Sequence, residues 1–150
     1  MDIKIEEMTI TDLNNIKDNL NNDFDNFWNY TILKEEIESN NSKYIVAKID
    51  NEIVGFAGIK IIMDEADIMN IVTKQAFRNQ GIGTLLLENL ISIAHELQLS
   101  SISLEVNEEN SPAIHLYEKF GFQNLGIRKN YYQDKNAIIM TKNLNKTKNI

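Results

Sequence analysis

The chain has 150 residues, of which 43% are hydrophobic and 25% are charged, and its formal net charge is −7. This length and composition predict one domain, large enough to bury about 70% of the surface that the unfolded chain exposes. The negative charge disfavours nucleic-acid binding, and the absence of cysteine excludes disulfides, thiolate zinc sites and a cysteine nucleophile.

The sequence contains no apolar run of about twenty residues and no charged-then-apolar leader. We therefore expect neither a membrane span nor a signal peptide, and a cytoplasmic protein is the default expectation. The two histidines, His95 and His115, lie far apart in the sequence and no carboxylate pattern accompanies them. We expect both to be structural or surface residues, and we expect no metal site.

The first half of the chain predicts four strands and two helices. Alternating apolar and polar residues indicate the strands, and a threonine cap followed by apolar residues three or four apart indicates the first helix. Trp28 lies in an Asn- and Asp-rich loop, where it is either a plug of the core or a wall of a substrate site. The expected elements are a strand at 2–8, a helix from Thr9 or Thr11 to about Leu20, a loop at 21–29, a helix at 30–39, strands at 44–49 and 52–63 around Asp50-Asn51, a turn at Asp64-Glu65, and a strand from Ile68 to Thr73.

The second half predicts two helices and three strands. They are a helix at 82–97, a strand at 101–106, a helix that Ser111 caps and Gly121 stops, and strands at 122–128 and 137–141 joined through residues 130–134. Residues 143–150 predict a polar tail, which leaves residues 1–142 as the domain. The order β-α-α-β-β-β-α-β-α-β-β predicts an α/β (α+β) fold, with a mixed central sheet of about seven strands flanked by about four helices.

A basic loop with two glycines joins the strand ending at Thr73 to the helix that follows. It reads Arg78-Asn79-Gln80-Gly81-Ile82-Gly83 and is followed by Thr84. The first backbone N–H groups of a helix have no partner within the helix, and with the positive end of the helix dipole they suit a phosphate. The glycines allow a close approach, and Arg78 adds a positive charge. An ordinary strand-to-helix turn is the alternative, and the loop fits neither the Walker pattern nor the dinucleotide pattern.

This loop resembles the Arg/Gln-x-x-Gly-x-Gly pyrophosphate loop of the GNAT N-acetyltransferases. Residues 104–122 resemble the L-E-V-x-x-x-N-x-x-A-x-x-L-Y-x-x-x-G-F segment of the GNAT enzymes that acetylate protein N-termini. Residues 127–132 and 137–140 resemble the end of the branch that acetylates ribosomal-protein alanine. The resemblance covers residues 45–142 well and the first 40 weakly. It implies the GNAT fold and acetyl-CoA as cosubstrate.

The resemblance also implies which residues carry the function. Glu105 corresponds to the family's general base and Tyr117 to its general acid. The residues expected to bind acetyl-CoA are Ile71, Val72, Thr73, Arg78, Asn79, Gln80, Gly81, Ile82, Gly83, Thr84, Asn110 and Tyr117. Those expected to contact the acceptor are Trp28, Asn70, Glu105, Tyr131 and Tyr132.

The chemistry favours an α-amine as acceptor. Its pKa is about 8, so deprotonation at pH 7 costs roughly 1 kcal/mol, against 4 to 5 kcal/mol for a lysine with a pKa of about 10.4. Glu105 at the end of a strand, acting through a water if needed, suffices as base. A backbone N–H of residues 71–73 would meet the oxyanion, and Tyr117 would protonate the leaving thiolate. Without cysteine, a covalent intermediate through sulfur is impossible, so direct transfer is expected.

The resemblance implies that the acceptor is the N-terminal alanine of a ribosomal small-subunit protein. An enzyme with a charge of −7 would attract a basic N-terminus of this kind. We expect a monomer or a weak dimer. Other N-termini, lysines and small amines are alternative acceptors, and a non-catalytic acyl-CoA-binding module is the alternative outside enzymes.

Several of these residues have structural interpretations as well. Glu105 could be a solvated strand residue, Tyr117 a packing aromatic and Asn110 a turn residue. Tyr131 and Tyr132 could cover a strand edge instead of walling a peptide groove. The sequence departs from the family pattern at two places towards the acceptor: Asn136 replaces a frequent acidic residue, and Phe27-Trp28 replaces Pro-Trp.

Overall fold

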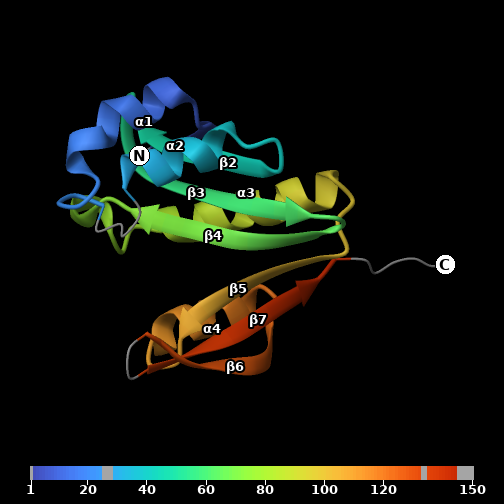
Figure 1. Ribbon diagram of the computed structural model, residues 1–150. Coiled ribbons are helices and arrows are strands. Elements are labelled where there is room, and N and C mark those ends of the chain that lie inside the picture. Colours follow the sequence, from blue (N-terminus) through green and yellow to red (C-terminus); the bar gives the residue numbers. More distant parts are fainter. Residues whose placement is uncertain (1, 25–28, 133–134, 145–150) are drawn as a thin grey trace. The chain divides into compact units, whose positions relative to one another are not determined.

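The computed structural model describes residues 2–24, 29–132 and 135–144. Within them, seven strands form one mixed sheet in the order β1-β2-β3-β4-β5-β7-β6, accompanied by four α-helices (Figure 1). This confirms the predicted fold class. The chain divides into two compact units, and each is described by itself below. The first contains Met1–Lys60 and Met69–Ser92, and the second contains Ile61–Ile68 and Ile93–Ile150.

The predicted order of elements is also confirmed, with small changes at their ends. The strands are β1 (Lys4–Glu7), β2 (Ser42–Ile49), β3 (Glu52–Ile62), β4 (Glu65–Thr73), β5 (Ser101–Asn107), β6 (Gln123–Tyr132) and β7 (Lys135–Asn143). The α-helices are α1 (Ile10–Ile16), α2 (Tyr30–Glu38), α3 (Ile82–Glu96) and α4 (Ser111–Lys119), and the 3-10 helices are η1 (Lys17–Asn19) and η2 (Gln75–Phe77).

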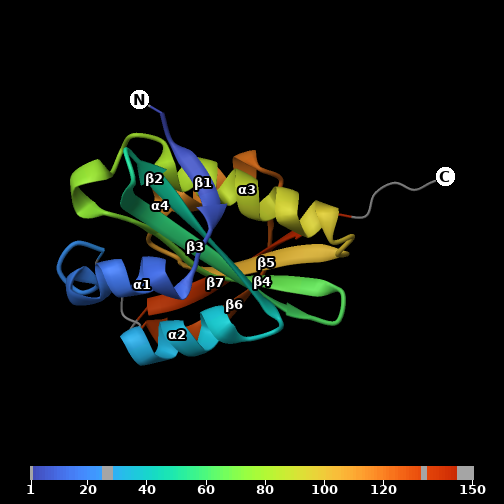
Figure 2. The same cartoon turned by 90° about the horizontal axis from the view of Figure 1, so that it is seen from above.

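The first unit is built around the antiparallel strands β1, β2 and β3, with α1 and α2 side by side (Figure 2). The ring of Phe24 lies 5.7 Å from that of Phe56, which places it in the core. Trp28 and Phe27 lie outside the described residues. The core cluster contains Met8, Leu13, Ile16, Leu20, Phe24, Leu33, Tyr44, Val46, Ile53 and Phe56.

Local signals fix the ends of these elements. Thr9 caps α1 in a capping box with Asp12, so Thr9 and not Thr11 is the cap. The predicted single helix tightens into η1 after Ile16. Asp50 and Asn51 both have positive φ angles, of 51° and 70°, and they form the two-residue turn of the β2–β3 hairpin. Such a turn matches the twist of the two strands that it joins.

In the second unit, β7 pairs antiparallel with β5 on one side and with β6 on the other (Figure 1). Residues 65–67 at the start of β4 pair in parallel with residues 101–103 of β5. Alternate residues of β5 are buried, as the sequence predicted. The buried hydrophobic residues of these strands and of the segment before β6 include Ile102, Leu104, Val106, Phe122 and Met140.

Three expectations for the second unit were wrong in detail. The turn before β4 is formed at Met63, whose φ is 58°, and Asp64, because Glu65 already begins β4. Tyr131 and Tyr132 belong to β6 and not to the connecting loop. Asn143 ends β7, and Leu144 is buried with its N–H donating to Ser100 O at 2.9 Å, so neither residue belongs to a frayed tail. Pairing with β7 and β5 extends these strands beyond what their own residues indicate.

Among the residues that the structure describes, no helix has the length and apolar character needed to span a membrane.

Candidate functional site

The glycine loop of the first unit leads directly into α3. The N–H of Leu85 donates to Gly81 O at 3.0 Å, which makes Gly81 the residue that precedes the first helical turn. Gly81 has a φ of +86°, a conformation that residues with a Cβ rarely adopt. A Cβ at Gly81 would meet no atom within 4 Å, and one at Gly83 would meet only Thr73 Oγ1, at 3.8 Å. The protein leaves open space above both glycines, as a bound phosphate would require.

The loop is exposed, but the helix behind it is firmly anchored. Residues 78–81 are exposed, whereas the side chain of Ile82 is only 1% exposed. A Cβ at Gly55 would lie 3.1 Å from both Ile82 Cγ2 and Leu86 Cδ1, so α3 packs closely on β3. Because the Ile82 side chain is buried, Ile82 can offer a ligand only its backbone.

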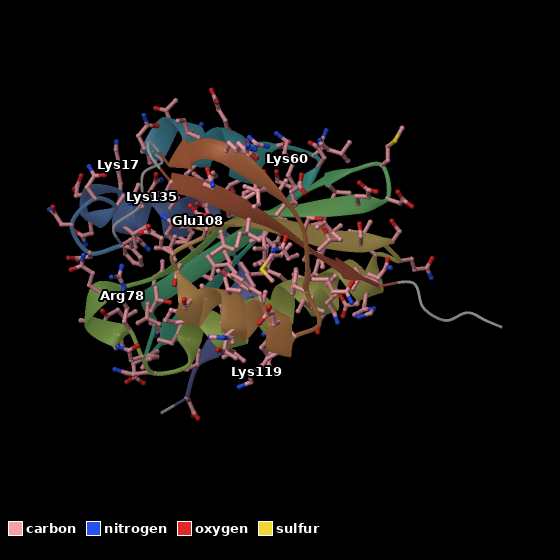
Figure 3. All side chains as sticks on the ribbon, turned by 90° about the horizontal axis from the view of Figure 1, so that it is seen from below. Lys17, Lys60, Arg78, Glu108, Lys119 and Lys135 are labelled. Atoms are coloured by element: carbon pink, nitrogen blue, oxygen red, sulfur yellow. The ribbon has the colours of Figure 1, made fainter. Side chains whose placement is uncertain are left out.

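Arg78 is the cationic residue of this loop (Figure 3). Its Nε donates to Thr73 O at 3.3 Å, which connects the loop to the end of β4. The guanidinium has further donors, in a planar arrangement that matches phosphate oxygens. The first unit therefore brings together the positive charge, the two glycines and the beginning of α3.

Residues 70–73 at the end of β4 are half-buried. Asn70 Nδ2 donates to Tyr44 Oη at 3.1 Å, so its amide already has a partner within the protein. Burial raises the pKa of the Tyr44 phenol, and its side chain belongs to the core of the first unit. Asn70 thus has a structural contact, and its assignment to the acceptor site stays a prediction.

Glu105 lies near the end of β5 in the second unit. It is paired with Ile139 of β7, and its side chain is 25% exposed. Its Oε2 lies 2.8 Å from Nη2 of Arg128 on β6, an ion pair that the sequence did not predict. The two residues lie on strands that β7 separates, and no local sequence pattern indicates that β7 lies between β5 and β6.

Tyr117 lies on α4, and its ring makes an edge contact with Phe122 at a centroid distance of 5.8 Å. The same residue accepts hydrogen bonds at its carbonyl from the N–H groups of Phe120 and Phe122, both at 3.0 Å. These bonds close α4 at Gly121, whose φ is +93°, and confirm the predicted glycine stop. The ring is thus held in place by the end of its own helix.

Asn110, and not Ser111, is the N-cap of α4, which corrects the predicted helix start. Its Oδ1 accepts from Ala113 N at 3.3 Å, so Ser111 and Pro112 occupy the first two helical positions. The turn interpretation of Asn110 therefore has a structural basis. Its Nδ2 is not needed for the cap, so the cap is compatible with a contact to acetyl-CoA.

The loop between β5 and α4 carries two carboxylates, those of Glu108 and Glu109, outside the predicted site residues. Asn136 N donates to Glu108 Oε2 at 3.1 Å, and the Asn136 side chain donates to Oε1 at 3.4 Å. Glu109 pairs with Lys135 at 3.3 Å (Figure 3 labels Glu108 and Lys135). Asn136 is where the family often has an acidic residue, and here it lies against a carboxylate supplied by the loop.

The remaining predicted residues fall into two groups. Tyr131 and Tyr132 lie in the last part of β6, and Trp28 lies outside the described residues. Each unit gathers its own set: the loop and the end of β4 in the first, and Glu105, Tyr117 and Asn110 in the second. Within residues 2–24, 29–132 and 135–144, no group of three His, Asp or Glu side chains is arranged as metal ligands would be.

Comparison with known proteins gives consistent matches. The family model described as "Acetyltransferase (GNAT) family" matches residues 13–122. A Bacillus subtilis (strain 168) protein, provisionally assigned as a [ribosomal protein bS18]-alanine N-acetyltransferase, is 35% identical over 94% of this chain and 95% of its own. The [ribosomal protein bS18]-alanine N-acetyltransferase of Haemophilus influenzae is 38% identical over 75% of this chain and 80% of its own. The crystal structure of the Escherichia coli ribosomal-protein-S18-alanine N-acetyltransferase has a TM-score of 0.89 at 26% identity, covering 98% and 97% of the two chains.

Proposed function

Since the chain belongs to the GNAT acetyltransferase family, we propose that it transfers acetyl from acetyl-CoA to the N-terminal alanine of a ribosomal small-subunit protein of the bS18 type. It is an acetyl-CoA-dependent N-acetyltransferase, as its relatives are. The choice of alanine as acceptor rests on one observation. The chain is 35% identical, over nearly its whole length, to a relative assigned to alanine N-acetylation.

The geometry of the glycine loop supports binding of acetyl-CoA. The open space at Gly81 and Gly83 would admit the pyrophosphate to the first N–H groups of α3, and Arg78 would add charge. The region proposed to bind acetyl-CoA also contains Asn79, Gln80 and Thr84. Residues 71–73 of β4 would bind the acyl end through their backbone, and Asn110 would bind the pantetheine arm.

The reaction needs a proton removed from the amine and a proton given to the thiolate. Acetyl-CoA supplies the activated thioester carbonyl. Glu105 accepts the proton of the α-amine, directly or through a water. A backbone N–H of residues 71–73 stabilises the oxyanion, and the Tyr117 hydroxyl protonates the sulfur as it leaves.

The acceptor is a basic N-terminus, which the net charge of −7 attracts. We propose that the acceptor peptide contacts Asn70, Trp28, Tyr131 and Tyr132. We place the enzyme in the cytoplasm, with a catalytic domain that extends from the predicted boundary at residue 142 to the buried Leu144, and we expect it to act as a monomer or weak dimer without a metal.

The test is CoA release from acetyl-CoA in the presence of a hexapeptide that begins Ala-Arg. The comparison peptide has a blocked N-terminus and one internal lysine. Release with the free alanine peptide alone supports the proposal. Release with the blocked peptide alone would replace it by lysine acetylation, and release with neither, despite acetyl-CoA binding, would point to a small amine.

A second experiment separates an enzyme from a non-catalytic acyl-CoA-binding module. Glu105→Gln should bind acetyl-CoA as the wild type does but lose turnover. Unaltered turnover would remove Glu105 from the mechanism.

A further inference from the structure

The guanidinium of Arg128 is in direct contact with the carboxylate of Glu105. Nη2 lies 2.8 Å from Oε2, a distance typical of a strong charge-assisted hydrogen bond. The contact is made through Oε2, and the second oxygen of a carboxylate has lone pairs of its own. A nearby cation in a fixed position restricts how the Glu105 side chain can rotate.

The sheet register shows how Arg128 reaches this place. Arg128 of β6 lies opposite Ala137 of β7, and Glu105 of β5 lies opposite Ile139 of β7, so the register places all four residues on one face of the sheet. Strands β5 and β6 are separated by β7, a span of roughly 10 Å. Only a long side chain lying flat over β7 can cross it.

The residues along this path are small where Arg128 has to pass. Ala137, directly opposite Arg128, presents a single methyl group and is completely buried. Gly126 lies opposite Ile139 on the next row, and a Cβ there would meet no atom within 4 Å. Glu105, Ile139 and Gly126 thus lie side by side across β5, β7 and β6. Because the β6 member of this line is a glycine, it has no side chain that would compete with Arg128 for the carboxylate.

A contribution to folding does not explain this contact well. The Arg128 side chain is 55% exposed and that of Glu105 is 25% exposed. Ion pairs in such solvated places contribute little to stability. Orientation matters more, because a general base must lie within hydrogen-bond reach of the proton it removes.

We propose that Arg128 is a positioning residue of the acetyl transfer, holding the Glu105 carboxylate in the orientation from which it accepts the amine proton. This inference rests on the proposed function. Arg128 touches neither substrate in this role and acts only through Glu105.

The experiment measures kcat and KM for the alanine hexapeptide with Arg128→Gln, Arg128→Lys and the control Lys129→Gln, which removes an exposed charge from the same strand. Arg128→Gln should lower kcat about tenfold or more, as misplaced catalytic groups do. Its KM for acetyl-CoA and its thermal midpoint should stay at the wild-type values. Arg128→Lys should recover most of the loss, and Lys129→Gln should have no effect.

A double-mutant cycle gives the deciding readout. Because Glu105→Gln has lost multiple turnover, the cycle follows the slow residual acetyl transfer in a single turnover; in that background Arg128→Gln should slow the transfer no further, since its route of action through Glu105 has been removed. An equal loss in both backgrounds would overturn the proposal, since Arg128 would then act independently of Glu105. Two results for the single variant Arg128→Gln would also overturn the proposal. One is a kcat at the wild-type value, and the other is a lower KM for the peptide. If the wild type itself released no CoA with the alanine peptide, the proposed function would fail first, and the inference with it.

Discussion

The ring of Tyr44 lies directly over the backbone of Gly58, its partner in the β2–β3 register. A Cβ added at Gly58 would fall among the ring carbons of Tyr44. The ring is held there from its far end as well, since its hydroxyl accepts a hydrogen bond from Asn70 on β4. The glycine thus provides the space in which a core aromatic residue links three strands.

Gly58→Ala should therefore lower the free energy of unfolding by about 1–3 kcal/mol, because the added methyl forces Tyr44 out of a packed core. The matched control is Gly126→Ala, where a Cβ meets open space and stability should stay within about 0.5 kcal/mol of wild type or rise slightly. Urea denaturation of both variants checks the contrast. Equal stabilities would show that the Tyr44 ring moves aside at no cost.

No local sequence pattern identifies Tyr44 as the residue that lies over Gly58. Pairing of Tyr44 with Gly58 follows from the hairpin register, which the Asp50-Asn51 turn determines. The order of all the elements could be predicted, because apolar periodicity and helix signals are local. The insertion of β7 between β5 and β6 is not local, so the contact of Arg128 with Glu105 could not be predicted.

Asp12 gives the protein a carboxylate whose titration is linked to folding. Burial raises the pKa of Asp12, but the hydrogen bonds with Thr9 and the ion pair with Lys48 at 3.1 Å outweigh it, so the folded-state pKa lies below the usual value. A lowered pKa stabilises the fold above the unfolded value of about 3.9, and this contribution is lost as pH falls through the folded pKa. Asp12→Asn should cost about 1 kcal/mol at pH 7, comparable to a helix-capping interaction.

The difference between Asp12→Asn and wild type should shrink as the pH falls below about 4, because the carboxylate of the unfolded chain then takes up a proton before that of the folded protein does. Urea midpoints at pH 7, 5 and 3 measure this. Asp18→Asn, at an exposed position of η1, is the control and should show little difference at any pH. A difference between Asp12→Asn and wild type that stays constant down to pH 3 would contradict the linkage.

The two loop glycines should separate stability from ligand binding. Gly83→Ala lies within α3, where alanine is favoured over glycine by up to about 1 kcal/mol, so the thermal midpoint should hold or rise. Its methyl group would nevertheless occupy the space proposed for the pyrophosphate, so the Kd for acetyl-CoA should increase about tenfold or more. Gly81→Ala should lose affinity and also about 1–2 kcal/mol of stability, since its φ is +86°. Calorimetric titration with acetyl-CoA, together with thermal melts, tests both; unchanged affinity in Gly83→Ala would argue for an ordinary turn.

Asn110 shows how a functional and a structural signal can coincide. The family pattern assigns it to the cosubstrate, and the structure uses its Oδ1 to cap α4. The sequence alone favoured Ser111 as the cap, since serine followed by proline is a common helix start. Both residues suit a cap, and only the backbone geometry distinguishes them: the cap is one residue earlier than the sequence predicted.

Tyr117→Phe should separate the packing role of this residue from its chemistry. Phenylalanine keeps the edge contact with Phe122, so the ring should still pack at the end of α4. Loss of the hydroxyl should lower kcat by about a hundredfold, because the leaving thiolate would lack its proton donor. Tyr30→Phe is the control: it removes a hydroxyl that donates to Asn14 at 2.7 Å on the surface, and turnover should not change. Wild-type turnover in Tyr117→Phe would leave Tyr117 as a packing residue and require another acid.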